Sequence, residues 1–479
     1  MNKPFQFFNI NREDRPFGDR AAEKDKLLDD CFIDLGYLNN ILNGSQTLFA
    51  GPKGVGKSAI AKYLRNQKTH STFVSDFNKQ RFEGLFNLLH LENRSFSVLT
   101  ILSEMLLYLS VFESLAGDNS LYFTSEWPEI EKCLNTFYIH ITNKRLMQER
   151  KIEIDIPKIF SKFSLSEKIE NISPTLIQFQ AIISRLEKLL ASIAIKNRHF
   201  IIVDNIDDDY GNVPSLDYNN GITALLTKID HINTLHQNIK IVVFIRTDIL
   251  DGLYGSNISK ITGNAARISW GNTTAEAVEN FSSMIQKRVN KLTTRQFSDK
   301  DGWTQLYEEI WDRANPPTVN LTPENILDMT QWRPRDIVEW LNSIHLHYSK
   351  LKSINTNNLV QAGYNSERAY SNYFLSELRD ASHVEICQIV DFNNLISAWK
   401  TLRLINFNKS TWTKHMCKKL SISEIDSIKV LEILYNHGVI GIIREKNFQI
   451  WSYRGHHGEF DENATLLLHK GLYKNFGFQ

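Results

Sequence analysis

Three short apolar runs, each followed by polar residues, are the first regular feature along this chain. They cover residues 47–50, 200–203 and 241–245. Consecutive apolar residues, as opposed to alternating ones, are typical of strands buried on both faces of a parallel sheet. The segments between these runs carry apolar residues at helical spacing. The pattern therefore predicts an α/β fold built on a parallel sheet.

Helical spacing is clearest in three regions. It predicts a helix within residues 27–42, which lead into the first strand, and helices at residues 98–107 and 176–195. The chain between the first two strands is longer than a minimal strand–helix–strand unit requires. We interpret about residues 78–175 as an α-helical insertion in the α/β domain.

The last third of the chain has a different pattern. Residues 384–395 and 425–435 predict helices, while residues 438–443 and 448–453 predict two strands joined by a charged turn. Helices followed by a β-hairpin are typical of a winged helix, which serves as a docking module for nucleic acid or protein.

Composition and charge exclude several classes of protein. The chain has 479 residues, and Lys+Arg 55 against Asp+Glu 54 leave no global charge that would select a partner. No apolar run approaches the roughly 18 residues of a membrane helix, and no signal-peptide core follows Met1. The scattered cysteines form no C-x-x-C pair. We expect a cytoplasmic protein without a membrane anchor, a disulfide framework or a zinc site.

A glycine-rich loop follows the first predicted strand and precedes a predicted helix. The motif G-x-x-x-x-G-K-[ST] is formed by Gly51, Pro52, Lys53, Gly54, Val55, Gly56, Lys57 and Ser58, with Ala59 next. Glycines allow the backbone amides to point at an anion, and the helix adds its positive N-terminal end. Lys57 would reach the β- and γ-phosphates, and the Ser58 hydroxyl would bind Mg²⁺. The motif predicts a site for ATP with Mg²⁺.

An acidic cluster ends the second apolar run. Asp204 follows residues 200–203 directly, and Asp207 and Asp208 come shortly after. Ligands bind at the carboxyl edge of parallel sheets, so we expect Asp204 to hold the metal and Asp207 or Asp208 to polarise the attacking water. The alternative interpretation is a solvated acidic turn after a core strand.

Arginines follow the third strand and begin a later helix. Arg246 ends residues 241–245, where it could stabilise charge on a transferring phosphoryl group or pair with an aspartate of the acidic cluster. Arg333 and Arg335 flank Pro334, which is typical of a helix start. They suit a lid helix that lays an arginine over the nucleotide. Their alternative is an ion pair with Asp336 or Glu339.

Taken in order, residues 51–58, 200–208, 242–248 and 332–342 resemble the prokaryotic AAA-like and STAND-like P-loop ATPases, and most closely the KAP-type and origin-recognition-like ones. The resemblance implies an ASCE-type sheet, a helical lid and a C-terminal winged helix. It places the Walker A motif at 51–58, the Walker B motif at 200–204, Arg246 at the sensor-1 strand end and Arg335 at the sensor-2 position. We predict a P-loop ATPase domain (1–275), a helical lid (276–375) and a winged-helix-like domain (376–479).

One residue departs from the family's pattern. The resemblance implies an acidic residue directly after the Walker B aspartate, but this chain has Asn205. Fast hydrolysis would then require Asp207 or Asp208 to act on water. A nucleotide-gated switch or scaffold with little turnover is therefore an alternative to an ATPase.

The C-terminal region carries a run of basic residues. No acidic residue occurs between Asp391 and Glu424, whereas Trp399 and Trp412 lie within that stretch. Its basic residues are Lys400, Arg403, Lys409, Lys414, Lys418 and Lys419. Such a stripe beside a winged helix is typical of nucleic-acid binding, and its alternatives are a solvated face or a protein-docking surface.

We expect a regulatory, ATP-hydrolysing enzyme whose nucleotide state changes conformation or assembly. A DNA-binding regulator that uses the P-loop domain only for dimerisation is a further alternative. Lys260 and Arg267 either act on a neighbour's nucleotide in a homo-oligomer or are ordinary surface residues. The resemblance implies a role in bacterial antiviral defence or DNA maintenance. No effector domain is recognisable, so we expect a companion protein.

Overall fold

The computed structural model describes residues 15–77, 96–136, 172–204, 206, 215–253, 258–292, 323–351, 355–444, 449–454 and 460–478. Its contacts divide the chain into two compact units. Unit 1 comprises Met1–Leu35, Pro52–Gly56 and Ser269–Gln479, and unit 2 comprises Gly36–Gly51 and Lys57–Ile268. The predicted three-domain boundaries stay a prediction.

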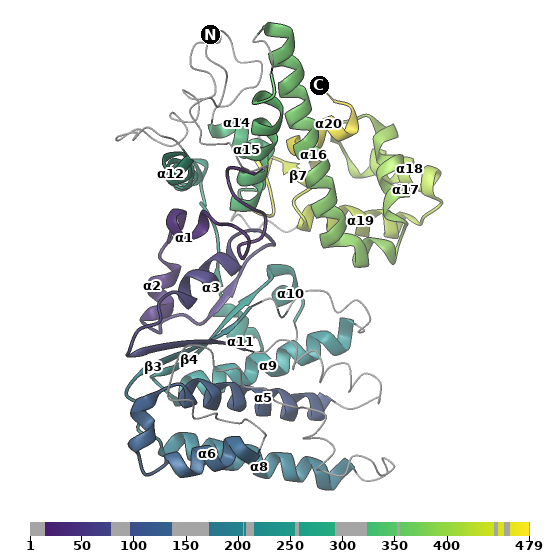
Figure 1. Ribbon diagram of the computed structural model, residues 1–479. Helices are drawn as coiled ribbons and strands as arrows, with labels where there is room; N and C mark the ends of the chain where they lie inside the picture. The colour runs from purple at the N-terminus through teal and green to yellow at the C-terminus, as the bar shows by residue number, and fades with distance from the viewer. Residues whose placement is uncertain are drawn as a thin grey trace. The chain divides into compact units, whose positions relative to one another are not determined.

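A five-stranded sheet forms the centre of unit 2 (Figure 1). Its strand order is β2-β3-β4-β1-β5, and each neighbouring pair is parallel. The predicted α/β fold built on a parallel sheet is confirmed. The strands are β1 (Leu48–Ala50), β2 (Thr72–Asp76), β3 (Arg198–Val203), β4 (Ile239–Ile245) and β5 (Ala266–Arg267).

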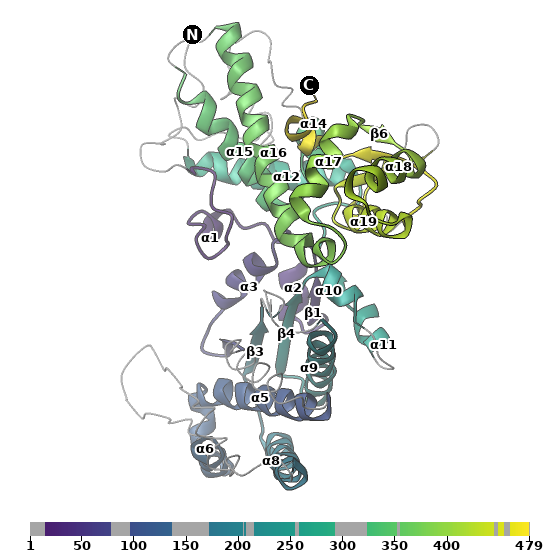
Figure 2. The same cartoon turned by 90° about the vertical axis from the view of Figure 1, so that its right-hand side faces the viewer.

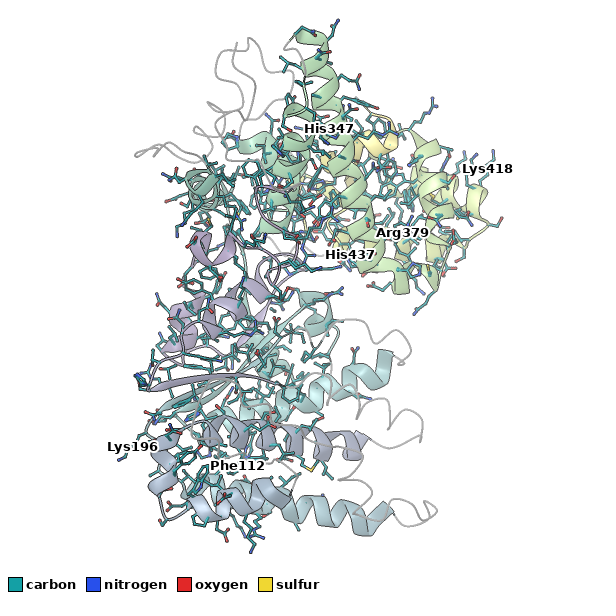
Figure 3. The ribbon with its side chains drawn as sticks, viewed as in Figure 1. Phe112, Lys196, His347, Arg379, Lys418 and His437 are labelled. Atoms are coloured by element: carbon teal, nitrogen blue, oxygen red, sulfur yellow. The ribbon has the colours of Figure 1, made fainter. Side chains whose placement is uncertain are left out.

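Helices cover this sheet in layers. Helices α5 and α9 pack on the sheet and against each other, while α6 and α8 pack on α5 as a further layer (Figure 2). The side chain of Phe112, on α5, is fully buried in this apolar core (Figure 3). The helices of unit 2 are α2 (Tyr37–Leu42), α3 (Lys57–Arg65), α5 (Phe96–Ala116), η1 (Asn119–Phe123), α6 (Trp127–Thr136), α8 (Ile172–Ser192), α9 (Ser215–Leu235), α10 (Thr247–Asp251) and α11 (Ile258–Gly263).

Unit 1 combines long helices with a smaller sheet. Helices α15 and α16 lie side by side, and a four-stranded antiparallel sheet has the order β6-β9-β7-β8. The helices are α1 (Leu28–Cys31), α12 (Thr274–Leu292), α14 (Pro323–Met329), α15 (Pro334–Tyr348), α16 (Thr356–Cys387), α17 (Phe392–Leu402), α18 (Lys409–Leu420), α19 (Glu424–Asn436), η3 (Lys470–Leu472) and α20 (Tyr473–Phe476). The strands are β6 (Asn406–Phe407), β7 (Ile440–Ile443), β8 (Gln449–Ile450) and β9 (Thr465–Leu468).

Two predicted helices are wrong in extent, because each is interrupted. Within 27–42, α1 ends at Cys31, where Phe32 is extended, and α2 begins after Gly36, whose φ is 90°. Within 384–395, α16 ends at Cys387, and the Asp391 side chain accepts a hydrogen bond from the Asn394 amide to begin α17.

The other elements predicted at the C-terminus are confirmed. Helix α19 covers the predicted 425–435, and β7 pairs antiparallel with β8 as the predicted hairpin. Strands β6 and β9 complete the sheet and were not predicted. Among the described residues, every helix is too short or too polar to span a bilayer.

Candidate nucleotide site

The glycine loop adopts a conformation that only glycine tolerates well. Gly54 and Gly56 have φ of 87° and 116°, in the region where a side chain is strained. The Gly51 amide donates a 3.1 Å hydrogen bond to the Ile245 carbonyl, so the loop leaves the sheet at the carboxyl end of β4. The predicted strand–loop–helix arrangement is confirmed, since β1 ends at Ala50 and α3 begins at Lys57.

Lys57 folds back over the start of the loop. Its Nζ donates a 2.8 Å hydrogen bond to the Gly51 carbonyl, and the residue is only 8% exposed. Both residues belong to unit 2. The position, beside the carboxyl end of the sheet where ligands bind, suits a lysine whose charge is used on a phosphate.

Ser58 and Asp204 meet at the carboxyl end of β3. The Ser58 hydroxyl donates a 3.4 Å hydrogen bond to Asp204 Oδ1. Mg²⁺ binds oxygen ligands at about 2.1 Å in octahedral geometry, so two adjacent ligands lie about 3 Å apart. The two oxygens have both the chemistry and nearly the spacing of a Mg²⁺ ligand pair, so they fit the predicted metal.

The strand order brings other predicted residues to the same edge. Strand β4 lies between β1 and β3, so Arg246, which follows β4, begins near the ends of both neighbours. Its Nε donates a 3.1 Å hydrogen bond to Asp248 on α10. Asp207 and Asp208, and Asn205 as well, lie outside the described residues. The catalytic roles of Arg246, Asp207 and Asp208 stay predictions.

Within unit 1, the loop tip Pro52–Gly56 is held through its carbonyl groups. Arg333 Nη1 donates to the Lys53 carbonyl at 3.0 Å, the Arg335 amide to Gly54 at 3.4 Å, and Trp270 Nε1 to Val55 at 2.8 Å. In a trans peptide the carbonyl and the next amide point in opposite directions. The amides of residues 54–56 therefore point away from these donors. The Val55 amide donates to the Pro52 carbonyl at 3.3 Å, so the Gly54 and Gly56 amides are the candidates for holding an anion.

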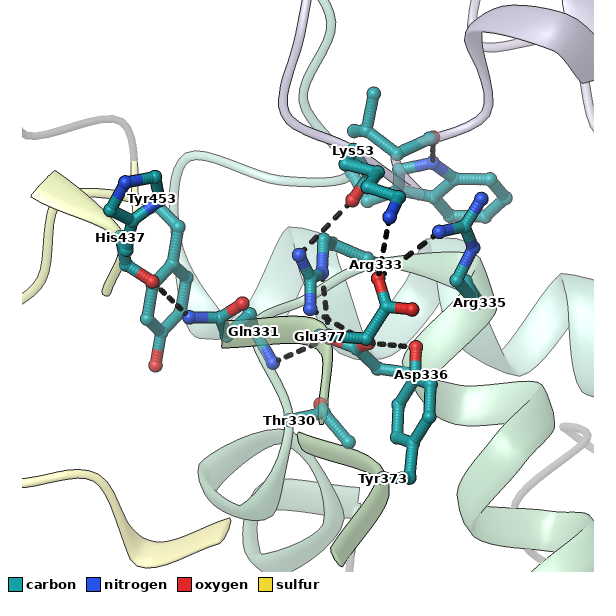
Figure 4. A network of polar contacts seen from close by, with 12 residues as sticks. Lys53, Thr330, Gln331, Arg333, Arg335, Asp336, Tyr373, Glu377, His437 and Tyr453 are labelled. Atoms are coloured by element: carbon teal, nitrogen blue, oxygen red, sulfur yellow. Dashed lines mark hydrogen bonds and ion pairs between the residues drawn. The ribbon is translucent and has the colours of Figure 1, made fainter. Parts of the chain in front are cut away.

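Arg333 is part of a buried polar network (Figure 4). Its guanidinium makes two hydrogen bonds to Asp336, at 2.8 and 2.9 Å, and the Tyr373 hydroxyl donates to the same carboxylate at 3.1 Å. Burial lowers the Arg333 pKa, but attraction to Asp336 outweighs it and the pKa is raised. For Arg333, the structure thus shows the alternative interpretation, a pair with Asp336.

Arg335 lies directly against the loop tip. A Cβ placed on Gly54 would be 3.1 Å from the Arg335 Cβ, so this position requires glycine on steric grounds too. The Arg335 Nη1 pairs with Glu377 Oε2 at 3.2 Å, and its Nε donates to the Arg20 carbonyl at 3.2 Å. Glu339, predicted as an alternative partner, instead accepts a 2.9 Å bond from the Arg20 side chain.

Two contributors to this region were missed by sequence reasoning. Trp270 bonds to the loop tip, and Glu377 belongs to α16, far along the chain from Arg335. Neither position stands out in sequence, because a single aromatic or acidic residue in a helix-rich segment is typical of ordinary packing and solvation. Contacts between distant segments revealed them.

The basic C-terminal segment divides into buried and exposed parts. Trp399 and Trp412 are fully buried and meet edge to face at 5.1 Å, so they are core residues and cannot stack on bases. Lys414, Lys418 and Lys419 of α18 are exposed, and Lys418 projects from the end of its helix (Figure 3).

The two cations proposed to act in an oligomer lie at the surface of unit 2. Lys260 on α11 is exposed, and Arg267 Nη1 pairs with Asp251 Oδ2 at 3.1 Å. An ion pair of this kind is typical of an ordinary surface residue. The role of either residue toward a neighbour's nucleotide stays a prediction.

Comparison with known proteins gives a weak likeness to solved structures. No family model matches the chain, and no curated protein matches it. Among solved structures, Cdc6p from Pyrobaculum aerophilum matches with 11% identity over 96% of this chain and 94% of that chain, at a TM-score of 0.28. At that score the likeness carries no argument, so the interpretation of the site depends on its own geometry.

Proposed function

We propose that this chain is a regulatory P-loop ATPase of the AAA+ type, which binds ATP with Mg²⁺ and couples its nucleotide state to a change of conformation or assembly. The observation that carries the proposal is the contact between Ser58 and Asp204. It joins the end of the glycine loop, which has two glycines at positive φ, to the acidic end of β3, with β4 between β1 and β3. KAP-type or origin-recognition-like membership belongs to the same proposal.

Each residue has a defined task in this mechanism. The loop amides and Lys57 would bind and orient the phosphates, while Ser58 and Asp204 would hold Mg²⁺. When bound there, Mg²⁺ would supply Lewis-acid neutralisation of the phosphate charge. Asp207 or Asp208 orients the attacking water in place of the acidic residue that Asn205 replaces. Lys57 and Arg246 would stabilise charge that develops on the phosphoryl group, and positioning with electrostatics supplies most of such catalysis. Within unit 1, Arg335 would bind the nucleotide at the loop tip.

Steady-state phosphate release tests the enzymatic part. Lys57→Ala removes the buried ammonium and should lower turnover at least about a hundredfold, since one preorganised charge of this kind contributes that much or more. Lys68→Ala is the matched control, because Lys68 is an exposed lysine just beyond α3. Equal turnover in wild type and Lys57→Ala would remove the proposed role of Lys57.

Asn205 favours a second candidate, a nucleotide-gated switch with little hydrolysis. A ligand at about a thousand times its Kd stabilises the bound state by about 4 kcal/mol, which is enough to change a domain or subunit arrangement without chemistry. Mass measured with and without ATP distinguishes the two. A nucleotide-dependent homo-oligomer without phosphate release indicates the switch, and sustained release indicates the enzyme.

The exposed lysines of α18 favour a nucleic-acid contact through the C-terminal region. The order α17, β6, α18, α19 and the β7–β8 hairpin suits a winged helix. Helix α19 exposes Glu424 and Glu432, whereas Lys418 and Lys419 end α18. We therefore propose that DNA binds to the exposed lysines of α18. A companion effector protein would bind to surfaces that the sequence does not identify.

Salt-dependent retention on duplex DNA tests this contact. Replacement of Lys418 and Lys419 by Gln should weaken binding and lower the slope of log K against log salt by roughly one per lost phosphate contact. Lys429→Gln on α19 is the control, since Lys429 lies on the neighbouring helix, away from the end of α18. Unchanged affinity and slope in the double variant would contradict the assignment.

A further inference from the structure

Glu377 forms ion pairs with two cations at the loop tip of unit 1. Its Oε2 lies 3.2 Å from Arg335 Nη1 and 3.9 Å from Lys53 Nζ. Lys53 belongs to the P-loop itself, and Arg335 packs on Gly54 of the same loop. A carboxylate from α16 thus neutralises charges that lie against a loop built for anions.

The Glu377 carboxylate is well placed to hold both cations. Its side chain is 13% exposed, against 56% for Asp380, which also approaches Lys53 at 4.0 Å. A half-buried pair is screened less by water and salt than an exposed one. The ion pairs of Glu377 are therefore less screened than the pair that Asp380 forms with Lys53.

Arginine and phosphate form strong paired hydrogen bonds, and so do arginine and carboxylate. A carboxylate on Arg335 and a phosphate of bound nucleotide are therefore alternative anions for the same guanidinium. A carboxylate carries a single charge, whereas a nucleotide triphosphate carries several. A nucleotide would replace Glu377, but the free energy of the lost ion pairs is subtracted from its binding.

We propose that Glu377 competes with nucleotide phosphate for Arg335 and Lys53 and thereby weakens the binding of Mg²⁺-ATP. The inference rests on the proposed function and adds a regulatory residue to it. Whatever moves α16 away from the loop tip raises nucleotide affinity, so a partner that contacts α16 could control nucleotide binding.

The test is calorimetric titration of Mg²⁺-ATP into wild type and Glu377→Gln. Glutamine keeps the size and one acceptor oxygen but removes the charge, so we expect Kd to fall about fivefold to tenfold. In an Arg335→Ala background the same substitution should change Kd by less than about threefold, because the competition is then confined to Lys53.

Glu367→Gln is the matched control. Glu367 also lies on α16, and its Oε2 pairs with Lys474 Nζ at 3.0 Å with similar exposure, 24% against 13% for Glu377. Its substitution removes the same charge from the same helix and should leave Kd within about twofold. Asp380→Asn, at a more exposed carboxylate, should change Kd less than Glu377→Gln does.

The outcomes separate this inference from the proposed function. If wild type binds Mg²⁺-ATP and Glu377→Gln binds it equally or more weakly, the competition is overturned while the nucleotide site stands. If only Glu377→Gln binds, the competition is supported in its strongest form. If neither protein binds, the nucleotide site itself is absent and both proposals fail.

Discussion

Gln331 Nε2 donates a 2.6 Å hydrogen bond to the backbone carbonyl of His437, at the end of α19. The Gln331 amide also donates to Asp336, which binds Arg333, and Arg333 in turn bonds to the Lys53 carbonyl. Within unit 1, these contacts connect the P-loop tip with the C-terminal helices and sheet (Figure 4). A change of conformation at the loop tip would therefore have a direct physical route to that region.

Gln331→Ala should loosen the C-terminal side of this network. The change leaves the His437 carbonyl without its side-chain donor, a loss of about 1–2 kcal/mol locally. We expect faster amide hydrogen exchange in residues 434–443, because the free energy of local opening there is lowered. Gln361→Ala, at an exposed position on α16, should leave exchange there unchanged. Equal protection from hydrogen exchange in Gln331→Ala and wild type would show that this hydrogen bond does not stabilise the C-terminal region.

Breaking the Arg333–Asp336 pair should be more costly. Arg333→Met leaves the fully buried Asp336 carboxylate without its main partner, which typically costs about 3–5 kcal/mol. The expected result is a lower urea midpoint for the unfolding of unit 1. Arg379→Ala removes an arginine whose partner Asn393 is exposed, and should cost less than about 1 kcal/mol. An Arg333→Met protein as stable as wild type would contradict a structural role for the pair.

His199 predicts a pH dependence in unit 2. Its ring lies between Ser114 Oγ, at 3.0 Å from Nδ1, and Asp118 Oδ2, at 3.5 Å from Nε2. Burial lowers the His199 pKa to about 4, although the Asp118 charge opposes the shift. The trio resembles a catalytic triad in composition, but all three residues are buried, which indicates a structural role.

The sign of the effect follows from proton binding. The unfolded chain takes up a proton at this histidine near pH 6.5 and the folded chain only near pH 4, so stability is lost as pH falls through that window. The loss is on the order of 3 kcal/mol in total. His199→Gln should lose less stability between pH 6.5 and 4 than wild type, and His70→Gln, at an exposed site, should match wild type. If the free energy of unfolding depends on pH in the same way in wild type and His199→Gln, the lowered pKa of His199 is contradicted.

Consecutive apolar residues made β1, β3 and β4 predictable, because strands buried on both faces need no polar alternation. Strand β2 was missed since only Val74 of its five residues is buried, and β5 since it spans two residues. Among the candidate site residues, a local sequence motif was enough to select the P-loop and Asp204, and their roles stay predictions. Glu377 and Trp270 act through tertiary contacts, which periodicity along a single chain does not encode.

Asp204→Ala should remove the metal dependence of activity and binding. Ser58 alone would offer one neutral oxygen, which is a poor ligand for a hard cation without a carboxylate beside it. Phosphate release, titrated with Mg²⁺ in wild type and variant, is the measurement. Asp230→Ala is the control, at an exposed carboxylate on α9. Retention of the wild-type Mg²⁺ titration by Asp204→Ala would refute this metal assignment.

The central claim is that the loop from Gly51 to Ser58 binds a nucleotide triphosphate together with Mg²⁺. Isothermal titration of ATP into the purified full chain, with Mg²⁺ and with excess EDTA, tests it most directly. We predict saturable, one-site binding that requires Mg²⁺ and disappears in Lys57→Ala. Absence of magnesium-dependent binding of ATP or GTP by the wild-type chain and by Glu377→Gln would contradict the account.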